Sequence, residues 1–98
     1  MNNLPFDRPG QFFKGNLHTH CTSSDGDFTA EEVISRYRQQ GYHFLAMSDH
    51  FLERYDYPVT NTHSYRTEDF TTLTAVELHA GKTLNDELWH VLEVGLLL

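Results

Sequence analysis

The segment FTAEEVISRYRQQGYHFLAMSDH, residues 28–50, carries the clearest structural pattern of the chain. Its first half contains a capping box, because Thr29 is followed three residues later by Glu32, and Gly41 is typical of the position just after a helix end. Acidic side chains lie near the start of this half and basic ones near its end, as the helix dipole favours. The sequence therefore predicts a helix over residues 28–41.

The second half of the segment is predicted to be a strand, with further strands on both sides of it. The apolar run FLAM, within residues 43–50, is typical of a strand buried on both faces in a parallel sheet. FFKGNLH, residues 12–18, predicts a short strand before the helix, which gives a strand–helix–strand unit. Residues 51–70 show no clean period and predict an irregular loop. Strands over 71–80 and 89–98, separated by turn residues, predict a hairpin.

These elements predict an α/β fold with a mostly parallel sheet. Such a sheet needs helices on its faces, yet one helix is evident and the chain ends on an apolar strand. We therefore expect residues 12–98 to be the N-terminal part of a larger domain. Residues 1–11 are expected to form an arm, because two prolines and a glycine interrupt any regular element.

Composition and charge restrict the class of function. The 98 residues include 14 acidic and 7 basic ones, which gives a formal net charge of −7, and no basic cluster is visible. This balance disfavours binding to nucleic acid or to an anionic membrane. The sequence shows neither a signal peptide nor an apolar run long enough to cross a bilayer. Its one cysteine, Cys21, excludes an internal disulfide and is expected to be a packed thiol, so a cytoplasmic protein is expected.

Side chains that suit a metal ion follow the predicted strands. His18 and His20 end the first strand, His50 ends the second, and Glu77 lies in the third. Because the carboxyl ends of parallel strands meet at one edge of a sheet, these side chains are expected to converge there. Asp25 would return over them from the loop that follows the first strand. Histidine with carboxylate is a ligand set for zinc, manganese or iron.

Each of these residues also has a structural explanation. A lone His-x-His is common, Asp25 before a glycine is typical of a turn, and Asp49 is compatible with a helix cap. His90, next to a tryptophan on a strand, is typical of a surface or hydrogen-bonded histidine. Glu77 is harder to explain in this way, because a buried carboxylate needs a partner. Their combination at successive strand ends favours the metal site.

The chain resembles the PHP family, the polymerase and histidinol phosphatase domains, which include small metal-dependent phosphoesterases. The resemblance covers residues 15–96 and rests on His18-x-His20 followed by SSDG, on SDH at 48–50, and on Glu77 and His90. It implies a distorted TIM-like (β/α)7 barrel, of which this chain would be a truncated N-terminal portion. The missing C-terminal half of the barrel would then be its partner.

The same resemblance implies up to three divalent metal ions, Zn, Mn or Fe, held by His18, His20, Asp25, His50, Glu77 and His90. The first ion would lie between the two histidines of the first strand and Glu77, which would bridge it to a second ion shared with His90. Asp25 and His50 would bind the third ion. Asp49, in the SDH motif, would be a further catalytic residue that orients a ligand imidazole.

The implied function is that of a metal-dependent phosphoesterase. Divalent ions would activate a water molecule to hydrolyse a small phosphorylated substrate or a nucleotide. Arg54 and Arg66, in the loop after the SDH motif, are the candidates for binding the phosphate of the substrate. Nucleic acid and membrane are not expected as partners.

Two alternatives remain open. The later ligands of the family, including an Asp-x-His motif, are absent, so the chain could be a catalytically incomplete fragment that binds metal weakly. A nuclease of the proofreading kind is the other alternative, which the acidic balance disfavours. His79 lies on the same strand face as Glu77 and is expected to support the site or to be exposed, rather than to bind a metal. His43 and His63 are interpreted as structural or exposed.

Overall fold

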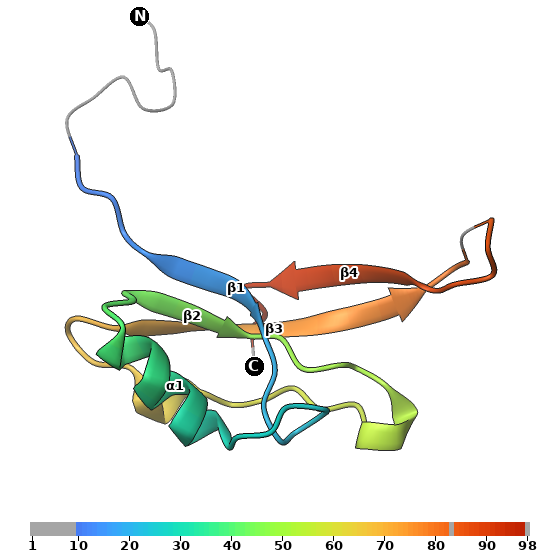
Figure 1. Ribbon diagram of the computed structural model, residues 1–98, viewed down its shortest axis with the longest axis horizontal. Coiled ribbons are helices and arrows are strands. Elements are labelled where there is room, and N and C mark those ends of the chain that lie inside the picture. Colours follow the sequence, from blue (N-terminus) through green and yellow to red (C-terminus); the bar gives the residue numbers. More distant parts are fainter. Residues whose placement is uncertain (1–9, 83, 98) are drawn as a thin grey trace, which may run out of the picture.

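The computed structural model describes residues 10–82 and 84–97, which form a four-stranded mixed sheet with strand order β1-β2-β3-β4. One α-helix lies against a single face of this sheet (Figure 1). The elements are β1 Gly15–Thr19, α1 Ala30–Gln39, β2 Phe44–Met47, the short 3-10 helices η1 Glu53–Tyr55 and η2 His63–Tyr65, β3 Thr71–Ala80 and β4 Trp89–Val94.

Helix α1 is confirmed, with the cap that the sequence predicts. The Thr29 hydroxyl accepts a hydrogen bond from the Glu32 backbone N–H at 3.2 Å, so the helix begins just after Thr29. The chain leaves the helix at Gly41, whose φ of 82° lies in the left-handed region that favours glycine. The helix is therefore shorter than the predicted 28–41, because the cap and the glycine lie outside its hydrogen-bonded turns.

Four strands form where the sequence predicts them, although β1 begins at Gly15 rather than at residue 12 and β4 ends at Val94, and their directions make the sheet mixed. β1 pairs with β2 and β2 with β3 in parallel, whereas β3 and β4 form the predicted antiparallel hairpin. In β2, Leu45, Ala46 and Met47 are all buried, as expected for a strand covered on both faces. The loop 51–70 is irregular apart from η1 and η2.

The prediction of a (β/α)7 barrel portion is wrong. In the described part of the chain, α1 is the one α-helix, and the last pair of strands is antiparallel. A parallel crossover needs a dozen or more residues, usually in a helix. Residues 81–88 are too few for such a crossover, and residues 51–70 lack the 3.6-residue period that would form a second helix. The protein is a small, mostly β structure.

The hydrophobic core lies between α1 and the sheet. It contains Cys21, Val33, Ile34, Leu45, Met47 and Phe70, with Tyr37, Tyr42 and Tyr65 packed against it. Cys21 is 1% exposed, so the prediction of a packed thiol is confirmed. Full burial of each large apolar side chain contributes about 1.5–3 kcal/mol, so this layer stabilises the packing of α1 on the sheet.

The opposite face of the sheet carries the candidate site. Leu45 packs against α1 and pairs with Thr72 in the register of β2 and β3, so the even-numbered residues of β3 share the face of the helix. Because side chains alternate along a strand, Glu77 and His79 of β3 lie on the face away from the helix.

Two other predictions concern the ends and the membrane. The predicted arm over 1–11 falls largely on residues 1–9, which lie outside the described residues; Gly10 and Gln11 are exposed and without regular structure. Among the described residues, no helix has the length and apolar character needed to span a bilayer.

Candidate metal centre

Glu77 is the centre of the candidate site and is fixed by the backbone on both sides. Its N–H donates to the Asp49 carbonyl and its carbonyl accepts from the Phe51 N–H, both at 3.0 Å. His50 and Glu77 thereby form an isolated parallel bridge beyond the end of β2. Glu77 is 1% exposed, so its carboxylate lies in a site that water hardly reaches.

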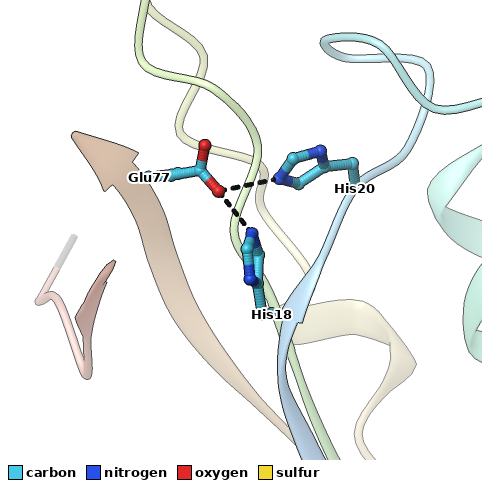
Figure 2. Close-up of side chains that lie close together, drawn as sticks. All are labelled: His18, His20 and Glu77. Carbon is cyan, nitrogen blue, oxygen red and sulfur yellow. Dashed lines mark hydrogen bonds and ion pairs between the residues drawn. The ribbon is translucent and has the colours of Figure 1, made fainter. Parts of the chain in front are cut away.

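One oxygen of this carboxylate faces the two histidines of the first strand. The Nε2 atom of His18 contacts Oε1 of Glu77, and Nε2 of His20 lies 3.4 Å from the same oxygen. Both rings point at the carboxylate from β1 and the residue after it (Figure 2). Their common direction follows from their spacing of two residues on an extended chain.

The other oxygen, Oε2, faces three further imidazoles. His50 Nδ1 lies 2.8 Å away, His90 Nδ1 3.2 Å and His79 Nε2 3.4 Å. The hairpin accounts for two of them, because His79 pairs with His90 in the register of β3 and β4 and their side chains share one face. A single buried carboxylate is thus surrounded by imidazoles on both oxygens.

Asp25 adds a second carboxylate at the edge of this cluster. Its Oδ1 lies 2.8 Å from His20 Nδ1 and its Oδ2 3.1 Å from His50 Nε2. Asp25 is carried by a tight loop in which the Gly26 N–H donates to the Cys21 carbonyl at 2.9 Å. A Cβ at Gly26 would lie 2.6 Å from the Cys21 Cα, so the loop closes this tightly only with glycine.

The structure therefore brings together all six of the predicted metal ligands, His18, His20, Asp25, His50, Glu77 and His90. Three groups among the described residues have ligand atoms within 4.8 Å of one another: His18 with His20 and Glu77, His20 with Asp25 and His50, and His50 with Glu77 and His79. Neighbouring groups share residues, so any bound cations would lie side by side.

Hydrogen bonding alone does not satisfy this cluster. His20 and His50 each direct both ring nitrogens at carboxylates, although a neutral imidazole has one N–H. His20 Nε2 and Glu77 Oε2 are buried and without a hydrogen bond among the described residues. Such unpaired buried atoms are unfavourable unless another group contacts them. A divalent cation, which accepts the lone pairs of imidazole and carboxylate, fits this donor set.

The pKa values of the carboxylates suit such a role. Burial by itself raises the pKa of Glu77, but a hydrogen bond from His18 and the charges of His50, His18 and His20 lower it below its usual range. The pKa of Asp25 is lowered in the same way, because the hydrogen bond from His20 and the charge of His50 outweigh its desolvation. Both groups are therefore ionised at neutral pH, as metal ligands must be.

Asp49 has a different role from the predicted one. Its buried carboxylate accepts hydrogen bonds from the Cys21 N–H at 2.9 Å, from the Ser24 hydroxyl at 2.6 Å and from the Thr60 hydroxyl at 2.6 Å. None of its described hydrogen bonds reaches an imidazole. Asp49 instead holds the loop that carries Asp25, and Ser24 extends this support by accepting from the His50 N–H at 3.2 Å.

His79 lies inside the cluster rather than on the surface, so of the two expectations for it the structure fits support of the site. Its side chain is 5% exposed, and its Nε2 lies 2.7 Å from His50 Nδ1. Burial, followed by the charges of His90 and His50, lowers its pKa, so the ring is neutral at neutral pH. The signal was present in the sequence, because His79 lies two residues from Glu77 on the same strand face.

Of the two arginines predicted to bind phosphate, one lies near the cluster and the other does not. Arg54 borders an open cleft of about 710 Å³ that is also lined by His50, His79 and His90. Arg66 donates through Nε to the Thr72 hydroxyl at 3.0 Å, near the start of β3 and away from Glu77. The structure thus brings Arg54 to the edge of the cluster, but not Arg66.

Comparison with known proteins finds similarity over a short segment of the chain. No protein-family model matches the chain. A curated protein named DNA polymerase/3'-5' exonuclease PolX, from Bacillus subtilis (strain 168), is 43% identical over 37 residues. This match covers 38% of the chain but spans 6% of the length of that protein.

Proposed function

We propose that this chain is a metal-dependent phosphoesterase related to the PHP family, in which His18, His20, Asp25, His50, Glu77 and His90 hold divalent cations. The observation that carries the proposal is the buried Glu77 carboxylate, with imidazoles on both of its oxygens and no hydrogen bond to Oε2 in the described structure. The nitrogen-rich donor set favours Zn²⁺, Mn²⁺ or Fe²⁺ over Ca²⁺.

Each residue of the cluster has a separate role in this proposal. Glu77 presents its two oxygens to different imidazoles, so one carboxylate can serve two neighbouring cations. Asp49 and Ser24 keep the loop of Asp25 close to His50. Divalent cations bound there would lower the pKa of a water molecule and offset the charge that develops on a phosphoryl group.

Arg54 is the proposed contact for the substrate. It lies on the cleft beside His79 and His90, where a guanidinium can bind phosphate oxygens with two hydrogen bonds. The cleft is open, which leaves room for a small phosphorylated molecule or a nucleotide.

A 3'-5' exonuclease activity is the second candidate, favoured by the similarity to the protein named PolX. Both candidates hydrolyse a phosphoester, so they differ in substrate rather than in the metal centre. The net charge of −7 favours the smaller substrate, although bound cations would offset part of this charge.

The test combines metal analysis with hydrolysis assays on the purified chain. We expect Mn²⁺- or Zn²⁺-dependent release of phosphate from para-nitrophenyl phosphate or nucleoside monophosphates, and little degradation of end-labelled single-stranded DNA. The reverse pattern would establish the exonuclease instead. Bound metal without hydrolysis of either substrate would identify a metal-binding chain that lacks catalysis, and absence of bound metal would contradict the proposal.

A further inference from the structure

His79 lies within the candidate metal centre and contacts both His50 and Glu77. Its Nε2 lies 2.7 Å from His50 Nδ1 and 3.4 Å from Glu77 Oε2, and its side chain is 5% exposed. Its ring centroid lies 4.3 Å from that of His90 and 4.9 Å from that of His50. The cleft that Arg54 borders opens beside it.

Hydrogen bonds explain these contacts only in part. The ring nitrogens of His50 and His79 face each other, so one proton at most lies between them. Glu77 Oε2, which both nitrogens approach, is buried and without a hydrogen bond among the described residues. One cation placed between the three atoms, in place of that proton, would contact a lone pair of each nitrogen and Glu77 Oε2.

We propose that His79 is a metal ligand, which binds through Nε2 a divalent cation shared with His50 Nδ1 and Glu77 Oε2. The inference rests on the proposed metal centre and adds to it a ligand position that the family resemblance did not assign. Two imidazoles and a carboxylate form a three-ligand set for zinc that leaves a position open.

The surroundings of His50 support this assignment. With Nδ1 on the cation, its Nε2–H donates to Asp25 Oδ2, which lies 3.1 Å away. Ligand histidines commonly donate their second N–H to a carboxylate in this way, and the contact fixes the ring and its tautomer. His50 and His79 line the same cleft as Arg54, so a phosphorylated substrate that enters there would reach a cation held by these two rings.

The test is His79→Cys in the full chain loaded with Co²⁺, because a thiolate on cobalt produces a near-ultraviolet charge-transfer band. We expect this band in His79→Cys. We expect none in the unmodified protein, whose Cys21 is packed in the core, and none in His63→Cys, a matched control whose ring contacts Thr74 rather than the cluster. Cobalt bound to His79→Cys without the band would overturn the inference.

A second variant covers the possibility that the cysteine disturbs folding. X-ray absorption of the zinc-loaded protein should show fewer imidazoles per zinc in His79→Asn than in the unmodified chain, and an equal number would overturn the inference. If the unmodified chain binds neither Co²⁺ nor Zn²⁺, the proposed metal centre fails as well. If the unmodified chain binds metal and substitution of His79 has no effect on the ligands, the assignment of His79 fails and the proposed metal centre stands.

Discussion

His50 and Glu77 are joined twice, once by the backbone bridge that extends β2 toward β3 and once by the 2.8 Å contact between Nδ1 and Oε2. The backbone bridge fixes the distance between the segment after β2 and strand β3, and at this distance the two side chains meet. A change that alters the bridge is therefore expected to alter the candidate metal centre as well.

Glu77→Gln should remove both metal and activity. An amide lacks the charge of a carboxylate and cannot serve two cations, so metal affinity should fall by roughly 100-fold or more, beyond what loss of a supporting contact causes. Elemental analysis after desalting and the phosphatase assay measure this.

Asp86→Asn is the matched control for this substitution. Asp86 is exposed in the hairpin turn with a φ of 64°, a conformation that asparagine also adopts. It should retain full metal content and activity. Retained activity in Glu77→Gln would place Glu77 outside the chemistry.

Removal of the metal with a chelator should lower the melting temperature. A cation present at 100 times its dissociation constant stabilises the folded state by about 2.7 kcal/mol, which corresponds to roughly 10–20 °C in a domain of this size. Calorimetry with and without EDTA measures the shift, and Glu77→Gln should show almost none.

The metal-free chain should lose stability on acidification in two stages. Burial and the charges of His90 and His50 hold the pKa of His79 below its usual 6.5, so just below pH 6.5 the unfolded state binds more protons and stability falls. The stabilising contribution of Glu77, whose pKa lies below its usual 4.5, is present above that pH and is lost as the pH falls further.

Urea unfolding at several pH values measures both stages. His79→Asn should weaken the first stage and keep the second. An unchanged first stage in that variant would show that another group controls it.

Asp49→Ala should destabilise the fold and weaken metal binding together. It leaves the buried Cys21 N–H and the part-buried Ser24 hydroxyl without their acceptor, which costs on the order of 3 kcal/mol. Because the same loop carries Asp25, metal affinity should fall by about 10–100-fold. Asp69→Asn, at an exposed position, should change neither quantity; loss of stability with unaltered metal affinity in Asp49→Ala would separate the two roles.

The sequence was a good guide wherever the local pattern decides the structure. The helix follows from Thr29, Glu32 and Gly41, and the strands follow from their apolar residues. The convergence of His18, His50 and Glu77 could be predicted because parallel strands end at one edge. The role of Glu77 could also be predicted, because a carboxylate in an apolar strand needs polar partners when it is buried.

The remaining features depend on contacts between distant parts of the chain. The prediction of a barrel was wrong because similar metal-ligand residues do not determine how many helices cover a sheet. The role of Asp49 depends on Thr60 and on the path of the loop 21–26, which no periodicity encodes. His79 differs from an exposed strand histidine only through the packing of His50 and His90 around it.

The pairing of His79 with His90 has a consequence for folding fidelity. In the observed register both imidazoles lie on the face of Glu77. A slip of β4 by one residue would turn His90 to the opposite face and bring an apolar neighbour into its place. A cation that needs these rings would therefore bind the aligned hairpin and not the slipped one, so metal uptake would select the correct strand alignment among competing ones.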